Sequence, residues 1–552
     1  MQKIALLLLI FTIHISCFSQ QNMDEAQKLA TLCKVWGFLK YHHPKVAKGQ
    51  YDWDKELVKK IPYIKSASTK NEINKIYFEW LKSLGKISEC KKCKNIDSAA
   101  LTYNLNHGWL TDTSIFVDDV IAKLNYIKDN RIQKQHYYIK YPQMPSPLFS
   151  KEKLYNEMVF PNEEYRLLCL FRYWNIINYF FPYKYVIGED WNNILLEMIP
   201  KFQFPKDTVD YHLAILEMTT KVNDSHASFK SKYIQQYFGE KYPPFIYTII
   251  DNKAIVKGFL NDSIAEENDI QHGDVIIALN NKNLAEVINE KKKYIGASNE
   301  ATKNRNLSVC LFNGSSDSCN ITIEREGQIL SKSFRLYSFS EIKDHLNTTK
   351  EDVCKELPDS IGYINMGVLT IKQVDSIMKI MMNKKAIIFD IRNYPNFTLY
   401  QISYYLNKEK RAFVKFTKPD FSYPGIFKWE SESYCGSNNP NYFKGKVVLL
   451  FNENTQSRAE FTCMALQTAP NVKCIGSQTS GADGNVSNIP LPGGYYVRMT
   501  GLGVFYPDGR ETQRIGIVPD IEVNPTIEGI KNKKDEVLER AIEYIIPIVN
   551  LK

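Results

Sequence analysis

The sequence predicts a multidomain α/β protein, with helical units first, a β-rich module in the middle and an α/β core at the C-terminal end. Three observations indicate this: an internal repeat of helical segments, a change to short strand-like runs near Pro243, and alternating strands and helices after Leu357. At 552 residues the chain also exceeds one hydrophobic core. The expected regions are a helical domain over 20–150, a second over 151–240, the β-rich module over 241–340 and the core over 350–550.

The first helical region contains one half of a duplicated unit. Its landmarks Trp36, Pro44 and Trp53 recur 138 residues later as Trp174, Pro182 and Trp191. The prolines end the first helix of each copy, and second helices are expected near Ile73–Leu84 and Tyr211–Val222. Two copies are too few for a solenoid, so the pattern indicates a duplicated helical unit.

The copies differ where their second helices end. The second copy reads Ser225-His226, whereas the first has Ser88 at the position that matches His226. A purely structural repeat does not require a histidine in one copy, and histidine is the side chain best suited to proton transfer near neutral pH. The alternative is that His226 is a helix cap or a surface residue.

The middle region reads as short strands separated by turns. Ile255–Leu260 is one strand, and Ile270–Asn280 is a turn that runs into another. The Gly273-Asp274 turn before a strand resembles a PDZ domain. That resemblance implies a peptide added as a strand to an exposed edge, with Gly273 and Asp274 as candidate substrate-binding residues.

The C-terminal region alternates buried strands with helices. Near-continuous apolar strands of this kind predict a mostly parallel sheet covered by helices. The expected strands are Ile361–Ile364, Ala386–Asp390, Val447–Phe451 and Val472–Gly476, and the expected helices are Ile371–Met382, Ser457–Leu466 and Asp535–Ile546, with a β-excursion at Tyr495–Phe505.

Ser457 lies where one of these strands turns into a helix. A serine at such a turn can present its hydroxyl outside the sheet, beside unpaired N–H groups at the helix N-terminus that would stabilise an oxyanion. The position therefore suits a nucleophile. The alternative is structural, since Ser457 and Glu460 also have the spacing of a capping box.

Several motifs in the second half of the chain belong together: Asp390-Ile391-Arg392, Ser457 with Glu460, Gly476–Ala482 and Gly516–Val523. With these motifs, the segment from His226 to Asn550 resembles the C-terminal-processing (tail-specific) serine proteases, in particular the tricorn-core-like branch. The resemblance implies a crotonase- or ClpP-like core. It also implies a serine endopeptidase that cleaves peptides or protein tails through an acyl-enzyme.

The resemblance also suggests which residue is the base. The tail-specific branch uses a lysine where this chain has Ala482, and no lysine occurs between Lys473 and Lys531. The tricorn-like branch instead uses a histidine preceded by a serine, which Ser225-His226 matches. We therefore expect Ser457 as nucleophile, His226 as base, Ser225 as a residue that positions the imidazole, and the neighbouring Gly481 in substrate binding.

The acid and the oxyanion site are less regular. Glu511 is the nearest acid ahead of the Gly516 motif and is the expected orienting carboxylate, with Gln513 and Asp483 as alternatives. The backbone N–H groups of Arg458 and Asn396 are the expected oxyanion donors.

The family's glycine-rich turn is replaced here by Asn393–Phe397, in which Pro395 has no N–H. That departure favours a second reading, a catalytically impaired homologue that binds peptides or glycans. Retention of Ser457, Ser225 and His226 favours the enzyme. A third reading, an unrelated hydrolase with a Ser–His pair, lacks a Gly-x-Ser-x-Gly elbow.

The N-terminus predicts export. Lys3 precedes an apolar run over 4–11 and small residues follow near Ser19, which indicates a signal peptide over 1–19. The run is too short for a lasting membrane span, and a lipid anchor at Cys17 is the alternative. We expect a periplasmic or extracellular protein.

Export would permit disulfides. Cys90 and Cys93 form a CxxC without a second pair nearby, so a local disulfide or free thiols are expected rather than zinc. Cys310 and Cys319 flank a turn between strand-like runs, which suggests a cross-hairpin disulfide.

Composition excludes other function classes. The net charge is +9, but the lysines are scattered among acids without a basic stripe, so nucleic-acid binding is not expected. The chain has no P-loop or dinucleotide fingerprint. We expect no metal and no cofactor.

Overall fold

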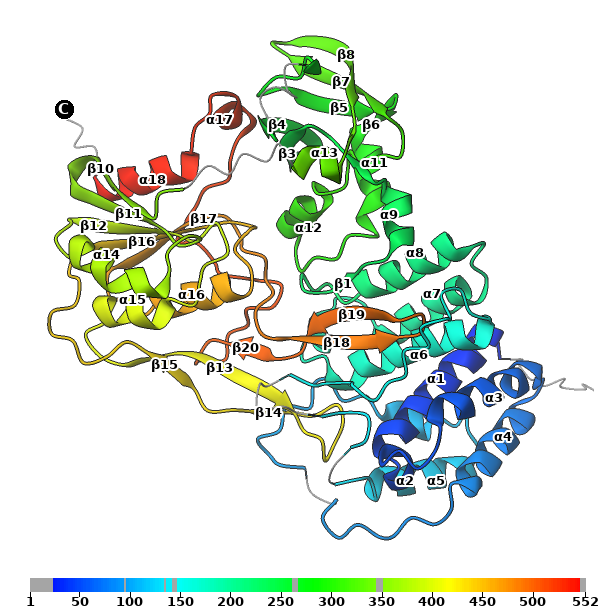
Figure 1. Ribbon diagram of the computed structural model, residues 1–552. Helices are drawn as coiled ribbons and strands as arrows, with labels where there is room; N and C mark the ends of the chain where they lie inside the picture. Colours follow the sequence, from blue (N-terminus) through cyan, green and yellow to red (C-terminus); the bar gives the residue numbers. More distant parts are fainter. Residues whose placement is uncertain are drawn as a thin grey trace, which may run out of the picture.

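The computed structural model describes residues 23–93, 96–133, 136–140, 146–260, 267–343 and 351–546. The predicted signal peptide over 1–19, with Cys17, lies outside these residues. None of the described helices has both the length and the apolar character needed to cross a membrane. Figure 1 shows the helical region at the lower right, the β-rich module at the top and the α/β core at the upper left.

The helical region contains the predicted duplication. The first copy consists of α1 (Glu25–His42), α3 (Trp53–Ser66) and α4 (Lys70–Ser83), and the second of α6 (Glu163–Phe180), α7 (Trp191–Gln203) and α8 (Thr208–Thr220). Each helix of the second copy begins 138 residues after its counterpart. The predicted repeat is therefore confirmed in three dimensions.

A reciprocal pair of tryptophan hydrogen bonds explains the fixed spacing. Trp36 Nε1 donates to the Trp53 carbonyl (2.9 Å), and Trp53 Nε1 donates to the Trp36 carbonyl (3.0 Å). Trp174 and Trp191 repeat this arrangement at 2.7 and 3.0 Å. A buried indole N–H needs an acceptor, and each pair gives both indoles one while joining the first two long helices of its copy.

The two copies pack on each other around one continuous apolar core. A buried ionic cluster crosses their contact: Lys40 and Arg172 both pair with Glu152 (2.7 and 3.1 Å), and Arg172 also pairs with Asp54 (2.7 Å). Two cations facing two carboxylates keep the cluster neutral, as burial requires. The helical region also contains α2 (Pro44–Ala47), α5 (Asp118–Asp129) and α9 (Lys232–Phe238).

The β-rich module is an antiparallel sheet in the order β3-β4-β5-β7-β8, with β6 beside β5. Its strands are β3 (Phe245–Ile250), β4 (Lys253–Phe259), β5 (Val275–Leu279), β6 (Lys282–Asn283), β7 (Ser318–Arg325) and β8 (Gln328–Arg335), and its helices include α11 (Leu284–Lys292) and α12 (Glu300–Leu307).

The predicted Cys310–Cys319 disulfide is wrong, because both cysteines are free thiols. Its premise, a strand before Cys310, fails, since the helix α12 and the turns that follow it occupy that segment.

The core is a six-stranded sheet in the order β10-β11-β12-β16-β17-β21, parallel from β11 onward. The strands are β10 (Cys354–Leu357), β11 (Ile361–Asn365), β12 (Ala386–Asp390), β16 (Lys446–Phe451), β17 (Val472–Gly476) and β21 (Ile521–Glu522). Helices α14 (Val374–Met381), α15 (Leu399–Leu406) and α16 (Arg458–Leu466) share one apolar cluster with the sheet, and α18 (Glu536–Ile545) shares another. The predicted helix-covered parallel sheet is confirmed.

Two excursions leave the core toward the helices (Figure 1). The hairpin of β18 (Val486–Leu491) and β19 (Tyr495–Thr500) pairs with β1 (Ser228–Phe229), two residues after His226. The hairpin thereby brings the end of the second copy to the core.

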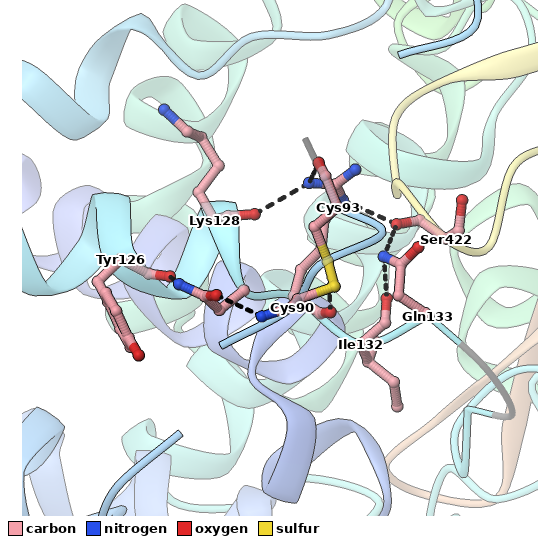
Figure 2. Close-up of a disulfide and its surroundings, with 9 residues drawn as sticks. Cys90, Cys93, Tyr126, Lys128, Ile132, Gln133 and Ser422 are labelled. Atoms are coloured by element: carbon pink, nitrogen blue, oxygen red, sulfur yellow. Dashed lines mark hydrogen bonds between the residues drawn. A yellow bond between two sulfur atoms is a disulfide. The ribbon is translucent and has the colours of Figure 1, made fainter. Parts of the chain in front are cut away.

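The second excursion is an arm formed by β13 (Arg411–Pro419), β14 (Phe427–Trp429), β15 (Ser433–Cys435) and β20 (Gly503–Phe505). Its tip contacts the first copy, where the Ser422 carbonyl accepts hydrogen bonds from Arg131 Nε (2.8 Å) and Gln133 Nε2 (3.1 Å). Figure 2 shows this contact beside the Cys90–Cys93 pair, which is a disulfide. Of the two alternatives for that pair, the structure therefore has the local disulfide.

Candidate active site

A cavity of about 730 Å³ lies where the three regions meet. Its lining combines His226 from the helical region, Ser457 from the core and residues near α12 from the β-rich module. The lining residues are His226, Arg305, Asn306, Val309, Tyr394, Asn454, Gln456, Ser457, Gly484, Asn485 and Val486. The predicted nucleophile and the predicted base therefore share one cavity.

Ser457 has an unusual backbone conformation between β16 and α16. Its φ is 55° and its ψ −117°, a region that non-glycine residues rarely adopt without support from surrounding structure. Its N–H donates to the Ala482 carbonyl (3.0 Å) and to Glu460 Oε2 (3.0 Å). The carboxylate half of the capping box is thus formed, and it holds a strained turn whose serine lines the cavity.

Glu460 fastens this turn to the next loop. Its buried carboxylate also accepts from Thr479 Oγ1 (2.6 Å) and from the N–H groups of Gly481 (2.7 Å) and Ala482 (3.1 Å). Burial raises the pKa of Glu460, while these hydrogen bonds lower it. Gly481, at a φ of 65°, gives its N–H to Glu460 and does not line the cavity; its role in substrate binding stays a prediction.

The Gly516 motif supports the same loop from behind. The Ile517 N–H donates to Thr479 Oγ1 (2.7 Å), and a Cβ on Gly516 would lie 2.2 Å from that oxygen. Gly516 also has a φ of 71°, so glycine is required there both by conformation and by the close approach of Thr479.

His226 is held by a relay to a buried acid. His226 Nδ1 lies 2.8 Å from Thr500 Oγ1, which donates to Asp224 Oδ1 (2.9 Å). Because a hydroxyl has one proton, Thr500 accepts from the imidazole, so Nδ1 carries the ring hydrogen. The other nitrogen, Nε2, then has its lone pair free to accept a proton.

Asp224 is fully buried and multiply bonded. It accepts from the N–H groups of Thr500 (2.6 Å) and His226 (3.0 Å), and its Oδ1 lies 3.4 Å from Gln513 Nε2 and 4.0 Å from His226 Nδ1. Burial lowers the pKa of His226, with Arg498 adding to that effect and Asp224 opposing it. The imidazole is therefore neutral, the form that a base needs.

Two of the three predicted candidates for the orienting role, Glu511 and Asp483, have other partners. Glu511 accepts from the Tyr185 hydroxyl (2.5 Å) and does not line the cavity. Asp483 is buried and accepts from the Gly484 N–H (2.6 Å), and burial together with Glu460 raises its pKa well above the usual range. Gln513 reaches the relay, through Asp224.

Sequence reasoning missed Asp224 and Thr500. The repeat contained a signal for Asp224, since the first copy has Lys86 at the matching position.

Ser225 forms hydrogen bonds to other segments of the fold rather than to the His226 imidazole. Its hydroxyl donates to the Ser480 carbonyl (3.0 Å) and accepts the Ser298 N–H (2.8 Å), and its carbonyl accepts from Gln456 Nε2 (3.3 Å). Ser225 therefore ties the helical region, the β-rich module and the nucleophile turn together.

The predicted oxyanion donors come from two segments of the core, the start of α16 and the turn over 393–397. None of the described residues accepts the Arg458 N–H, which begins α16, and the Asn396 side chain donates to the Leu369 carbonyl (2.9 Å). The Arg458 guanidinium lies over the rings of Tyr394 (5.2 Å) and Phe397 (5.9 Å). The aromatic residues of this turn thus pack against the Arg458 side chain. The roles of the Arg458 and Asn396 N–H groups as oxyanion donors stay predictions.

Gly273 and Asp274 shape the β-rich module. Both oxygens of the buried Asp274 carboxylate accept from Arg325 (2.7 Å each), and Gly273, at a φ of 89°, donates to the Val256 carbonyl (2.8 Å). Neither residue lines the cavity, and their role in substrate binding stays a prediction. Within the described part of the chain, no group of three His, Cys, Asp or Glu side chains could hold a metal ion.

Comparison with known proteins agrees with this geometry. Residues 360–523, which contain Ser457 and Glu460, match peptidase family S41. The chain therefore contains a peptidase S41 domain and is a serine peptidase. Its substrates are therefore peptides or proteins. No curated sequence matches the chain significantly.

Three solved structures are similar to this chain at low sequence identity. Mature CPAF in complex with lactacystin has a TM-score of 0.55 and 13% identity, over 69% of this peptidase and 99% of that chain. The photosystem II D1 C-terminal processing protease has a TM-score of 0.39 and 15% identity, over 66% and 96% of the two chains. The tricorn protease has a TM-score of 0.33 and 14% identity, over 69% and 36%. The likeness to CPAF supports the predicted multidomain α/β fold class.

Proposed function

We propose that this S41 peptidase is an endopeptidase in which Ser457 is the nucleophile and His226 the general base. The observation that carries the proposal is that these residues, from distant parts of the chain, line one cavity. The relay behind His226 supports it further, because the relay leaves Nε2 as the proton acceptor.

The proposed reaction proceeds in two halves. His226 Nε2 takes the proton of the Ser457 hydroxyl as Oγ attacks the scissile carbonyl carbon, and the backbone N–H groups of Arg458 and Asn396 stabilise the oxyanion. The tetrahedral intermediate collapses, the peptide C–N bond breaks, and the imidazolium gives its proton to the leaving amine. Water, deprotonated by His226, then hydrolyses the acyl-enzyme and releases Ser457.

In this proposal Asp224, rather than Glu511, is the orienting acid. It acts through Thr500, which fixes the imidazole tautomer, and it faces the imidazolium that forms during the reaction across 4.0 Å. Gln513 and two backbone N–H groups hold Asp224 in place.

The finer parts of the proposal concern substrate and place. From the resemblance to tail-specific proteases, the substrates are protein tails, and the β-rich module acts as the PDZ-like element that holds a peptide end. From the N-terminal sequence, the enzyme acts outside the cytoplasm, in the periplasm or the extracellular space.

A fluorophosphonate probe tests the catalytic assignment, because it labels activated serines. We expect labelling of the wild type, none of Ser457→Ala and little of His226→Ala. Labelling that persists in Ser457→Ala would refute the assignment. Mass spectrometry of the labelled peptide identifies the modified residue.

The second candidate function is a catalytically impaired peptide binder. The replacement of the glycine-rich turn by Asn393–Phe397 favours it, because Pro395 offers no N–H to an oxyanion. Peptide binding without any labelling of Ser457 would support this candidate over the enzyme.

A further inference from the structure

The cavity beside Ser457 has an uneven distribution of charge. Of the described residues that line it, none is an aspartate or a glutamate, and its permanently charged member is Arg305. Two acids near the site, Asp224 and Glu460, lie beneath its surface, fully buried and bonded to protein N–H and hydroxyl groups. A third, Glu453, is half-buried beside Arg305 but does not line the cavity. The described lining residues therefore carry a net positive charge.

Arg305 reaches this cavity from α12 of the β-rich module. Its guanidinium donates to the Glu453 carbonyl (2.6 Å), Gln456 Oε1 (2.7 Å) and Asn306 Oδ1 (2.9 and 3.1 Å), all of which are uncharged oxygens. It forms no ion pair with a carboxylate of the described chain. Burial lowers the pKa of Arg305, although Glu453 and Glu460 oppose this from a distance.

The geometry leaves Arg305 with a donor to spare. A guanidinium has five N–H groups, and these contacts use one on Nε, one on Nη1 and both on Nη2. One N–H on Nη1 is left for a ligand. Half-buried cations with neutral partners favour an anion, and guanidinium binds carboxylate more strongly than any neutral acceptor.

Two further arginines add to the positive field. Arg458 follows the nucleophile, and Arg498 is close enough to His226 to lower its pKa. Neither forms an ion pair within the described chain. Three arginines without carboxylate partners among the described residues thus lie near the reacting groups, one of them, Arg305, in the cavity lining.

We propose that this site selects peptides with a carboxylate next to the scissile bond, and that Arg305 is the specificity-determining residue. The inference rests on the proposed function. The carboxylate is either the free C-terminus of a short tail or an acidic side chain, since both present the same planar anion. Arg305 also holds the nucleophile turn through Gln456, so the test must separate binding of an anion from support of the turn.

Binding to the Ser457→Ala protein is the primary test, because it does not depend on turnover. Two peptide pairs serve as probes: one with a free or an amidated C-terminus, and one with Asp or Asn beside the cleavage position. We expect the carboxylate member of at least one pair to bind about tenfold tighter. Preference in the first pair assigns the terminus, and preference in the second assigns the side chain.

Adding Arg305→Gln to the Ser457→Ala protein should reduce that preference to about onefold, with the neutral peptides unchanged, and Arg305→Lys should retain part of it. The control is Arg411→Gln, which removes an exposed arginine paired with Glu409 in the core arm. Equal affinities for both members of both pairs, or a preference that survives Arg305→Gln, would overturn the inference.

Kinetics separate this inference from the proposed function. With active protein, the preference should appear mainly in KM and weaken as salt screens the arginines. Peptides that bind by charge but are never cleaved would refute the proposed function alone. Cleavage of acidic and neutral peptides at equal kcat/KM would refute the inference alone.

Discussion

The two helical copies have the same architecture and different tasks. Both have three matching helices and the same reciprocal tryptophan bonds. The second copy ends in Asp224-Ser225-His226 and reaches the cavity, whereas the first has Lys86-Ile87-Ser88 there and supports the arm of the core at Ser422. Both copies thus keep the same helical scaffold, and among the described residues of the two copies the end of the second lines the cavity.

The largest difference in activity between the two copies is expected at the last residue of each copy's matching segment, His226 in the second copy and Ser88 in the first. His226→Ala removes the proposed base and should lower kcat/KM about a thousandfold or more, because an unassisted serine hydroxyl is a weak nucleophile. Ser88→Ala, at the matching position, should leave kcat/KM within about twofold. Hydrolysis of a fluorogenic peptide measures both, and comparable losses in the two variants would contradict the division of tasks.

The relay acid gives the next largest effect. Asp224→Asn keeps the shape of the side chain but removes the charge that faces the imidazolium, so kcat should fall about a hundredfold. Lys86→Ala in the first copy is the matched control and should have no effect. The opposite outcome, a normal kcat for Asp224→Asn and a large loss for Glu511→Gln, would restore the acid expected from the sequence.

The tryptophan pairs should respond alike. Trp53→Phe and Trp191→Phe each delete one indole donor to a buried carbonyl and leave a small void, which should cost about 2 kcal/mol of stability. Thermal unfolding of the two variants should show similar losses. A much larger loss in one copy would mean that the copies do not share one packing principle.

The smallest effect is a shift in pH dependence. His226 must be neutral to act as base, and its pKa lies below its ordinary value of 6.5, so kcat/KM should rise with pH through a range below that value and then level. Asp224 raises this pKa, so Asp224→Asn should move the rising limb to lower pH. If the rising part of the kcat/KM profile of Asp224→Asn stays at the same pH as in the wild type, Asp224 does not act on the pKa of His226.

Much of the fold could be predicted because its signals are local. β12 and β17 match their predicted bounds. β12 is buried along its whole length, and a strand buried on both faces reads as a near-continuous apolar run. The repeat was visible because each tryptophan pair fixes its own spacing. The strand expected before Cys310 failed for the converse reason: a short run there does not distinguish helix from strand.

The sequence was enough to predict the nucleophile and the base of the candidate site, but not the hydrogen-bonded relay behind the base. Ser457 and His226 stand in recognisable motifs, whereas Thr500 contacts Asp224 from 276 residues away. That contact depends on the β18–β19 hairpin pairing with β1, and nothing local in either segment announces the pairing. The place of Arg305 in the cavity was equally hidden, because α12 belongs to the β-rich module and not to the core that carries Ser457.

The late position of the Thr500 hairpin in the chain also determines when the site can form during synthesis. A ribosome makes the base-bearing segment early and both Ser457 and Thr500 late, so a partly synthesised chain holds an imidazole without its relay and without a nucleophile. With the roles proposed above, hydrolytic power arises only after the last strands have returned to the helices. With these roles, a nascent chain cannot cleave other proteins until its folding is complete.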